Sequence, residues 1–135
     1  MTQVPVQVLV IDADDFIREA LRTLLEDAGL AAATTTSPAH ALEHLRAAAE
    51  RMVVLFDAGM PRVSDGQVTA LASIDDALLR RHEYICMTTS VALMHPDLRQ
   101  ALDSLAVPII EKPFDLDDLL TAVRQAQERL RPQAG

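Results

Sequence analysis

The feature that most constrains the fold is a series of short apolar runs separated by longer amphipathic or turn-rich stretches. The runs lie at residues 6–11, 30–35, 52–56, 84–87 and 107–110. Each run has the length of a buried strand, and the stretches between them have room for a helix that crosses back over a sheet. The pattern predicts an α/β fold with a five-stranded parallel sheet, alternating with five helices that cover both of its faces.

The first and last helices carry the clearest signals. In the first, the apolar residues at helical spacing are Phe16, Ile17, Leu21, Leu24 and Leu25. Gly29 then supplies the left-handed residue that commonly follows the end of a helix. In the last, the apolar face is predicted to consist of Leu116, Leu119, Leu120, Val123 and Leu130. Pro108 has no N–H to donate to a ladder, so the fifth strand is expected at an edge of the sheet.

The length of 135 residues fits one domain, which we place at residues 1–135, with a tail at 131–135 that is expected to fray. Half of the residues are hydrophobic but only 3% are aromatic, so the core must be aliphatic. The single cysteine, Cys86, lies in the fourth apolar run and is interpreted as a small core residue. An intrachain disulfide is therefore excluded.

The charge balance argues against several classes of partner. Twelve basic and twenty acidic side chains give a net charge of -8, which repels nucleic acid phosphates and anionic membrane surfaces. The sequence has neither a basic region ahead of its first apolar stretch nor an apolar run of roughly 18 residues that would span a bilayer. We expect a cytoplasmic protein that binds neither nucleic acid nor membranes directly.

Polar residues gather directly after the predicted strands. Asp12 and Asp14 follow the first strand, Asp57 the third, Thr88 and Thr89 the fourth, and Lys112 the fifth. The carboxyl ends of parallel strands meet at one edge of a sheet, where open α/β folds bind their ligands. The sequence therefore predicts that acids, a hydroxyl group and a lysine converge on one rim.

These residue types suit phosphoryl chemistry. Clustered carboxylates repel one another until a hard cation neutralises them, and Mg²⁺ is the natural candidate for oxygen ligands. A phosphoryl group that enters the rim would meet the metal, the Lys112 cation and the Thr88 hydroxyl, which together stabilise its charge during in-line transfer. Asp57 is the candidate nucleophile.

Four segments, in this order, resemble the signatures of response-regulator receiver domains. They are Val8-Leu9-Val10-Ile11-Asp12, Phe56-Asp57-Ala58-Gly59-Met60-Pro61, Thr88 and Lys112-Pro113-Phe114. The resemblance spans nearly the whole chain and implies a flavodoxin-like (βα)5 fold. It further implies that Asp57 accepts phosphate, Lys112 binds the phosphoryl oxygens and Thr88 moves toward the phosphate. Asp12, Asp57 and the backbone carbonyl of Gly59 would hold Mg²⁺.

The resemblance also implies the kinds of partner. A histidine kinase or a phosphotransfer protein would donate the phosphate, and the domain would signal to a downstream protein target. The surface presented to that target would be the fourth helix, fifth strand and fifth helix, and a homodimer is plausible. Enzyme activity of its own would be limited to slow self-catalysed phosphotransfer and dephosphorylation.

Two positions depart from the family pattern. Receivers usually carry two adjacent acids after the first strand, but Ala13 stands in place of the second. We therefore expect weak Mg²⁺ binding and slow phosphorylation, with Asp14 as a further candidate ligand that partly offsets the loss. Ile109 stands where an aromatic switch residue is expected, so signalling by rotation of a polar ring is not expected.

Two other functions remain open from the sequence. Ala13 and Ile109 favour a pseudo-receiver, which keeps the fold and signals by docking without a phosphate cycle. Asp12-Ala13-Asp14 also resembles the Asp-x-Asp signature of haloacid-dehalogenase-type phosphatases, in which Asp12 would attack and Asp14 would transfer protons. The histidines are interpreted as solvated helix residues (His40, His44) and turn residues (His82, His95).

Overall fold

The computed structural model describes residues 6–12, 14–36, 38–57, 81–89, 92, 94 and 96–130. The strands are β1 (Val8–Ile11), β2 (Ala32–Thr35), β3 (Val53–Asp57), β4 (Glu83–Thr88) and β5 (Ile109–Glu111). The helices are α1 (Asp15–Asp27), α2 (Pro38–Ala47), α5 (Pro96–Ser104) and α6 (Leu116–Leu130). All five predicted strands are present. The helix predicted between the third and fourth strands, the tail 131–135 and His95 lie outside the described residues.

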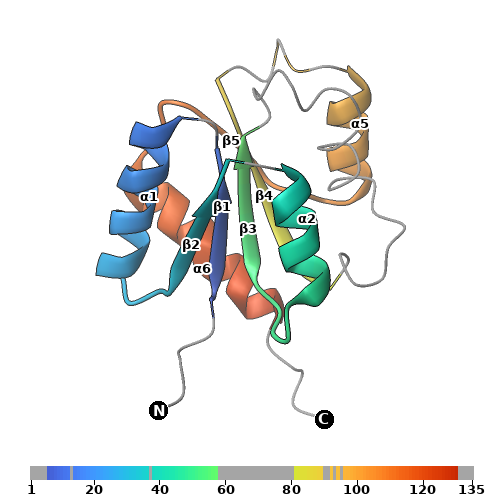
Figure 1. The fold of residues 1–135 in the computed structure, drawn as a ribbon. Helices are drawn as coiled ribbons and strands as arrows, with labels where there is room; N and C mark the ends of the chain where they lie inside the picture. The colour runs from blue at the N-terminus through green and yellow to red at the C-terminus, as the bar shows by residue number, and fades with distance from the viewer. Residues whose placement is uncertain are drawn as a thin grey trace.

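The five strands form one parallel sheet in the order β2-β1-β3-β4-β5 (Figure 1). This is the flavodoxin-like order, and it confirms the predicted fold class. It also places β5 at an edge, as Pro108 predicts. The chain runs from β1 outward to β2 and then returns to β3 on the other side of β1, so a topological switch point lies between β1 and β3.

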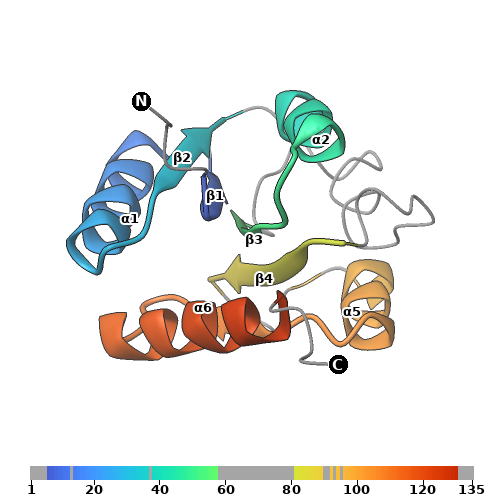
Figure 2. The same ribbon diagram turned by 90° about the horizontal axis from the view of Figure 1, so that it is seen from below.

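The sheet has an aliphatic core on each face because alternate residues of a strand point in opposite directions. Figure 2 shows α1 and α6 on one side of the sheet and α2 and α5 on the other. Val8 and Val10 of β1 pack toward α1 and α6, whereas Leu9 and Ile11 pack toward α2 and α5. Cys86 is fully buried in the second of these cores, as predicted.

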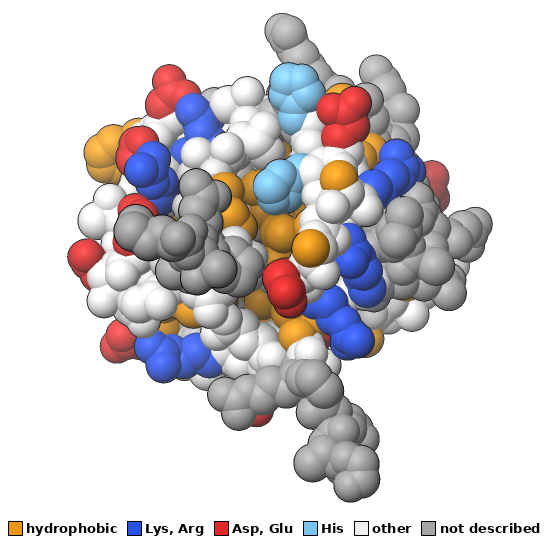
Figure 3. All heavy atoms as spheres, turned by 60° about the horizontal axis from the view of Figure 1, so that its bottom comes forward, with side chains coloured by type: hydrophobic (Ala, Val, Ile, Leu, Met, Phe, Trp, Pro, Cys, Tyr) orange, Lys and Arg blue, Asp and Glu red, His pale blue; other side chains and the backbone are white. Residues whose placement is uncertain are grey.

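Two residues predicted to lie on apolar helix faces are exposed instead. Phe16 is 81% exposed and Leu116 is 54% exposed. Each lies in the first turn of its helix, which begins at the rim beyond the strand ends rather than over the sheet. On the face that Figure 3 shows, Lys, Arg, Asp and Glu side chains lie around a central group of hydrophobic side chains.

His82 lies in the bend ahead of β4, which agrees with its interpretation as a turn residue, but its side chain is buried at the opposite end of the sheet from the predicted site. It is only 2% exposed. Its Nδ1 accepts a hydrogen bond from the backbone N–H of Met52 at 3.0 Å, and its Nε2 lies 2.9 Å from the carbonyl of Leu45. Arg81 also donates to the carbonyls of Leu45, at 3.0 Å, and Ala48. Together the two side chains satisfy carbonyls that the C-terminus of α2 leaves without helical partners.

The two helices α1 and α5 end in the same hydrogen-bonded turn, but with different residues at the left-handed position. In α1 this residue is Gly29, with φ +86°, and in α5 it is Ala106, with φ 56°. Glycine reaches this conformation freely, whereas the Cβ of alanine crowds the following carbonyl. The bonds that define the turn run from Leu30 N to Leu25 O and from Val107 N to Leu102 O, both at 2.9 Å.

We predict opposite effects when these two residues are exchanged. Gly29→Ala should lower the free energy of unfolding by about 1 kcal/mol, and Ala106→Gly should raise it by about 0.5 kcal/mol. A Cβ at Gly29 would meet nothing within 4 Å, so its cost is confined to the backbone. Urea unfolding of each variant measures the change. Effects of the same sign would contradict this account of the two turns.

His82 should make stability depend on pH. Burial, followed by the nearby Arg81 and His44 charges, lowers its pKa below the ordinary 6.5, against the opposing effect of the Leu45 carbonyl. As pH falls, His82 therefore takes up a proton at a higher pH in the unfolded chain than in the folded protein. The stabilisation is complete above about pH 6.5 and is lost as pH falls toward the folded-state pKa. We expect losses of up to about 1.4 kcal/mol per pH unit.

Urea unfolding between pH 7.5 and 5.5 measures this slope. His82→Asn keeps an acceptor for the Met52 N–H but cannot titrate, so it should be less stable at pH 7.5 and lose the slope. His40→Asn, at an exposed position of α2, is the matched control and should keep it. An unchanged slope in His82→Asn would show that another group is responsible.

Candidate functional site

Four of the predicted site residues come together at the carboxyl ends of the strands. Asp12 directly follows β1, Asp57 ends β3, Thr88 ends β4 and Lys112 follows β5. The ladder pairs Asp57 with Met87 and Thr88 with Glu111, and the Lys112 N–H donates to the Thr88 carbonyl at 2.7 Å. Parallel pairing in this register therefore brings the four residues to one rim, beside the switch point between β1 and β3.

The Lys112 ammonium group lies between two carboxylates. Its Nζ is 3.2 Å from Oδ2 of Asp12 and 3.4 Å from Oδ2 of Asp57. The side chains are 14% exposed for Lys112, 1% for Asp12 and 16% for Asp57. Charges this far removed from water must be paired, and here one cation serves two anions. The group retains a net negative charge and therefore attracts a further cation.

Asp12 is held on several sides. Its N–H donates to the Thr35 carbonyl at 3.3 Å, and its Oδ1 accepts from the Asp14 N–H at 2.9 Å. Its Oδ2 contacts Lys112. The carboxylate is thus fixed in direction by the loop that follows β1 and by the segment that follows β5.

Asp14 has a role that the sequence reasoning missed. Its Oδ1 accepts hydrogen bonds from the backbone N–H groups of Phe16 and Ile17, at 2.8 and 3.2 Å, so it caps the N-terminus of α1. An aspartate ahead of an apolar helical pattern is itself a capping signal, and it could have been recognised. A part for the exposed Asp14 in metal binding stays a prediction. Ala13 and Gly59 lie outside the described residues.

The rim can offer oxygen ligands but few acids. Among the residues that the structure describes, no group of three or more His, Cys, Asp or Glu side chains is placed to hold a metal ion. Asp12 and Asp57 supply two carboxylates, a donor set that suits Mg²⁺ rather than a soft metal. Thr88 is 4% exposed beside them, whereas Thr89 is exposed.

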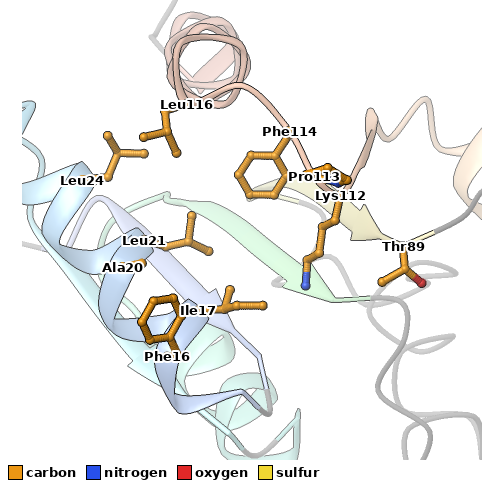
Figure 4. Close-up of a pocket in the computed structure, with 10 residues that line it drawn as sticks. All are labelled: Phe16, Ile17, Ala20, Leu21, Leu24, Thr89, Lys112, Pro113, Phe114 and Leu116. Atoms are coloured by element: carbon orange, nitrogen blue, oxygen red, sulfur yellow. The ribbon is translucent and has the colours of Figure 1, made fainter.

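An apolar hollow of about 520 Å³ adjoins this rim, and Lys112 lines both (Figure 4). One wall comes from α1 and the other from the segment between β5 and α6, where the Lys112–Pro113 peptide bond is cis. The lining residues are Phe16, Ile17, Ala20, Leu21, Leu24, Thr89, Lys112, Pro113, Phe114 and Leu116. Phe16 and Leu116, the large hydrophobic residues that are exposed in the part of the chain that the structure describes, thus lie next to the acidic site. The helical spacing of apolar residues predicted that both side chains lie in the core, so the sequence did not predict this exposed apolar surface.

Comparison with known proteins identifies relatives of the chain. The model of the response regulator receiver domain matches residues 8–124. Transcriptional regulatory protein FixJ of Azorhizobium caulinodans is 32% identical over 127 residues, which are 92% of this chain and 56% of that protein. C4-dicarboxylate transport transcriptional regulatory protein DctD of Pseudomonas aeruginosa is 34% identical over 125 residues, which are 90% of this chain and 25% of that protein. The chain thus spans about half of the length of FixJ and about a quarter of the length of DctD.

Solved structures agree with the fold. Response regulator StyR superimposes with a TM-score of 0.72 at 26% identity, over 93% of this chain and 61% of that one. A CheY-like receiver from Methanospirillum hungatei gives 0.77 at 19% identity, over 94% and 97% of the two chains. The beryllofluoride-activated NtrC4 receiver dimer gives 0.75 at 21% identity, over 93% and 98%. None of the described helices is long and apolar enough to cross a membrane.

Proposed function

The chain belongs to the family of response regulator receiver domains of two-component signalling, and from this premise we propose that its phosphoacceptor is the carboxylate of Asp57. The observation that carries the proposal is the Lys112 ammonium group, 3.4 Å from Asp57 Oδ2 at the carboxyl end of β3. A cation so close to the acceptor carboxylate can also bind the oxygens of an incoming phosphoryl group and stabilise their negative charge. Asp57 is also less buried than Asp12, which leaves it the more accessible of the two acids.

The transfer makes one bond and breaks one. A carboxylate oxygen of Asp57 forms a bond to phosphorus, while the bond from phosphorus to the donor's histidine nitrogen breaks and that nitrogen keeps the electron pair. Lys112 pairs with the phosphoryl oxygens, and Thr88 at the end of β4 is the hydroxyl proposed to approach the phosphate. Slow self-catalysed transfer from small donors, and slow hydrolysis, would use the same groups.

Receiver domains typically bind Mg²⁺ at their acidic site, and the donor set at this rim fits that ion. Asp12 and Asp57 are the residues proposed to hold it, with the Gly59 carbonyl as a third candidate. The ion would neutralise negative charge on the acids and on the phosphoryl oxygens. Since Ala13 replaces one acid, we propose weak binding.

The two alternative functions have less support. The Asp-x-Asp phosphatase reading needs Asp14 for proton transfer, but the Asp14 carboxylate caps α1. The pseudo-receiver reading still rests on Ala13 and Ile109. Against it, the Lys112–Asp57 pair is kept, and Ile109 is accounted for by packing against the core that α2 and α5 cover. The relatives reported above are regulators, which favours the receiver function.

We propose that the phosphodonor docks on the hollow lined by Phe16 and Leu116. A histidine kinase or phosphotransfer protein must bring a phosphohistidine to Asp57, so its docking surface has to adjoin the acidic rim. The hollow meets this condition because Lys112 lines both. Large exposed apolar side chains next to a polar site are typical of protein interfaces.

We propose that this phosphotransfer takes place in the cytoplasm. The surface formed by α5, β5 and α6 is proposed to contact the downstream protein target. We also propose a homodimer, by analogy with the NtrC4 receiver dimer.

Incubation with Mg²⁺ and acetyl phosphate, followed by intact mass measurement, tests the acceptor. The wild-type domain should gain one phosphoryl group, and Asp57→Asn should gain none because the amide cannot attack phosphorus. Asp12→Asn keeps the nucleophile and should still be labelled, more slowly. A wild-type chain that stays unlabelled while a control receiver is labelled would support the pseudo-receiver instead.

Phe16→Ser tests the docking surface. In a screen of purified histidine kinases, the kinase that labels the wild-type domain fastest should label Phe16→Ser at least about tenfold more slowly, since a central aromatic contact is removed. Labelling by acetyl phosphate should be unchanged, because this small donor needs no docking surface. Equal loss with both donors would mean that Phe16 supports the acidic site rather than the partner.

A further inference from the structure

Arg18 of α1 reaches back to the loop that carries Asp12. Its Nη1 donates to the backbone carbonyl of Asp12 at 2.8 Å, and its Nη2 contacts the Asp15 carboxylate. The Arg18 side chain is 15% exposed, whereas that of Asp15 is 89% exposed. The ion pair with Asp15 is therefore in water and contributes little, and the largely buried bond is the one to Asp12.

This bond completes the set of contacts around Asp12. The N–H of Asp12, both carboxylate oxygens and its carbonyl are each engaged, by Thr35, Asp14, Lys112 and Arg18 respectively. The carbonyl lies beyond the end of β1 and is not part of the strand ladder. Without Arg18 it would need water at a residue that is 1% exposed. Loss of this bond would free the peptide on which the direction of the carboxylate depends.

We propose that Arg18 is a positioning residue for the metal-binding acid. It fixes the main chain of Asp12 and thereby directs the Asp12 carboxylate toward Lys112 and Asp57. The inference rests on the proposed function, in which Asp12 helps to hold Mg²⁺. It gains weight from the sequence, because Ala13 removes the adjacent acid and leaves Asp12 as the acid of this loop nearest the site. Groups that orient metal ligands typically change metal affinity by about 10–100-fold when removed.

Two roles of Arg18 predict opposite results. If it positions Asp12, Arg18→Met should bind Mg²⁺ about tenfold more weakly, because the carboxylate becomes less fixed. If it acts only as a nearby positive charge, the same change should strengthen Mg²⁺ binding, because a repulsive cation is lost. Arg18→Lys keeps the charge with fewer donors and should fall between the wild type and Arg18→Met.

Titration of ¹⁵N-labelled wild-type and variant proteins with MgCl₂, followed by amide chemical shifts, measures the affinity. Hydrogen exchange of the Asp14 N–H gives a readout without metal, and it should be faster in Arg18→Met because the Asp12 Oδ1 that it contacts is no longer fixed. Arg22→Met, one turn later on α1 and paired only with exposed acids among the contacts found, is the matched control and should change neither.

Unchanged or tighter Mg²⁺ binding by Arg18→Met, with Asp14 exchange as in the wild type, would overturn the inference. So would a wild-type domain that shows no response to Mg²⁺. If Arg18→Met does not fold, an Arg18→Lys variant with wild-type affinity and exchange has the same meaning. Acetyl phosphate labelling of wild-type Asp57 is a separate result, so the proposed function can hold while this inference fails.

Discussion

The acidic rim depends on one cation shared by two carboxylates. The Lys112 ammonium group joins the end of β5 to Asp12 after β1 and to Asp57 at the end of β3. In the sheet β5 pairs with neither β1 nor β3, so the contact joins the edge strand to two interior strands. Without it, Asp12 would be a buried charge with no cationic partner among the described contacts, which is among the costliest defects that a fold can carry. The geometry of the site and the closure of this end of the fold therefore rest on the same interaction.

The sheet order explains why such a contact can form. Because β1 has β2 on one side and β3 on the other, the direction in which the strands are added reverses between β1 and β3, and open α/β sheets bind their ligands at the carboxyl ends of the strands at such a switch point. The first turns of α1 and α6 begin at the same rim, which is why Phe16 and Leu116 are exposed there. One topological feature thus produces both the acidic site and the apolar hollow beside it.

The sequence predicted the parts of this arrangement that follow from periodicity and topology. Short aliphatic runs identified the strands, and parallel pairing brought Asp12, Asp57 and Lys112 to one rim. Features that depend on where a helix begins, or on a contact distant in sequence, were missed. The cap formed by Asp14 and the exposure of Phe16 are of the first kind. The burial of His82 against α2 is of the second, because nothing near it in the chain signals the Leu45 carbonyl.

The replacement of one acid by Ala13 lowers the negative charge that the loop after β1 brings to the site. Asp12, Asp57 and Lys112 sum to one negative charge, whereas a second adjacent acid would make it two. At about 4 Å and an effective dielectric near 20, each unit charge contributes roughly 4 kcal/mol, and about twice that toward a divalent ion. We therefore expect the site to attract Mg²⁺ less strongly, and its acids to repel one another less. Lys112 can then neutralise part of the charge of Asp12 and Asp57 without a metal ion. To bind the phosphoryl oxygens, it has to give up its contact with one of these carboxylates.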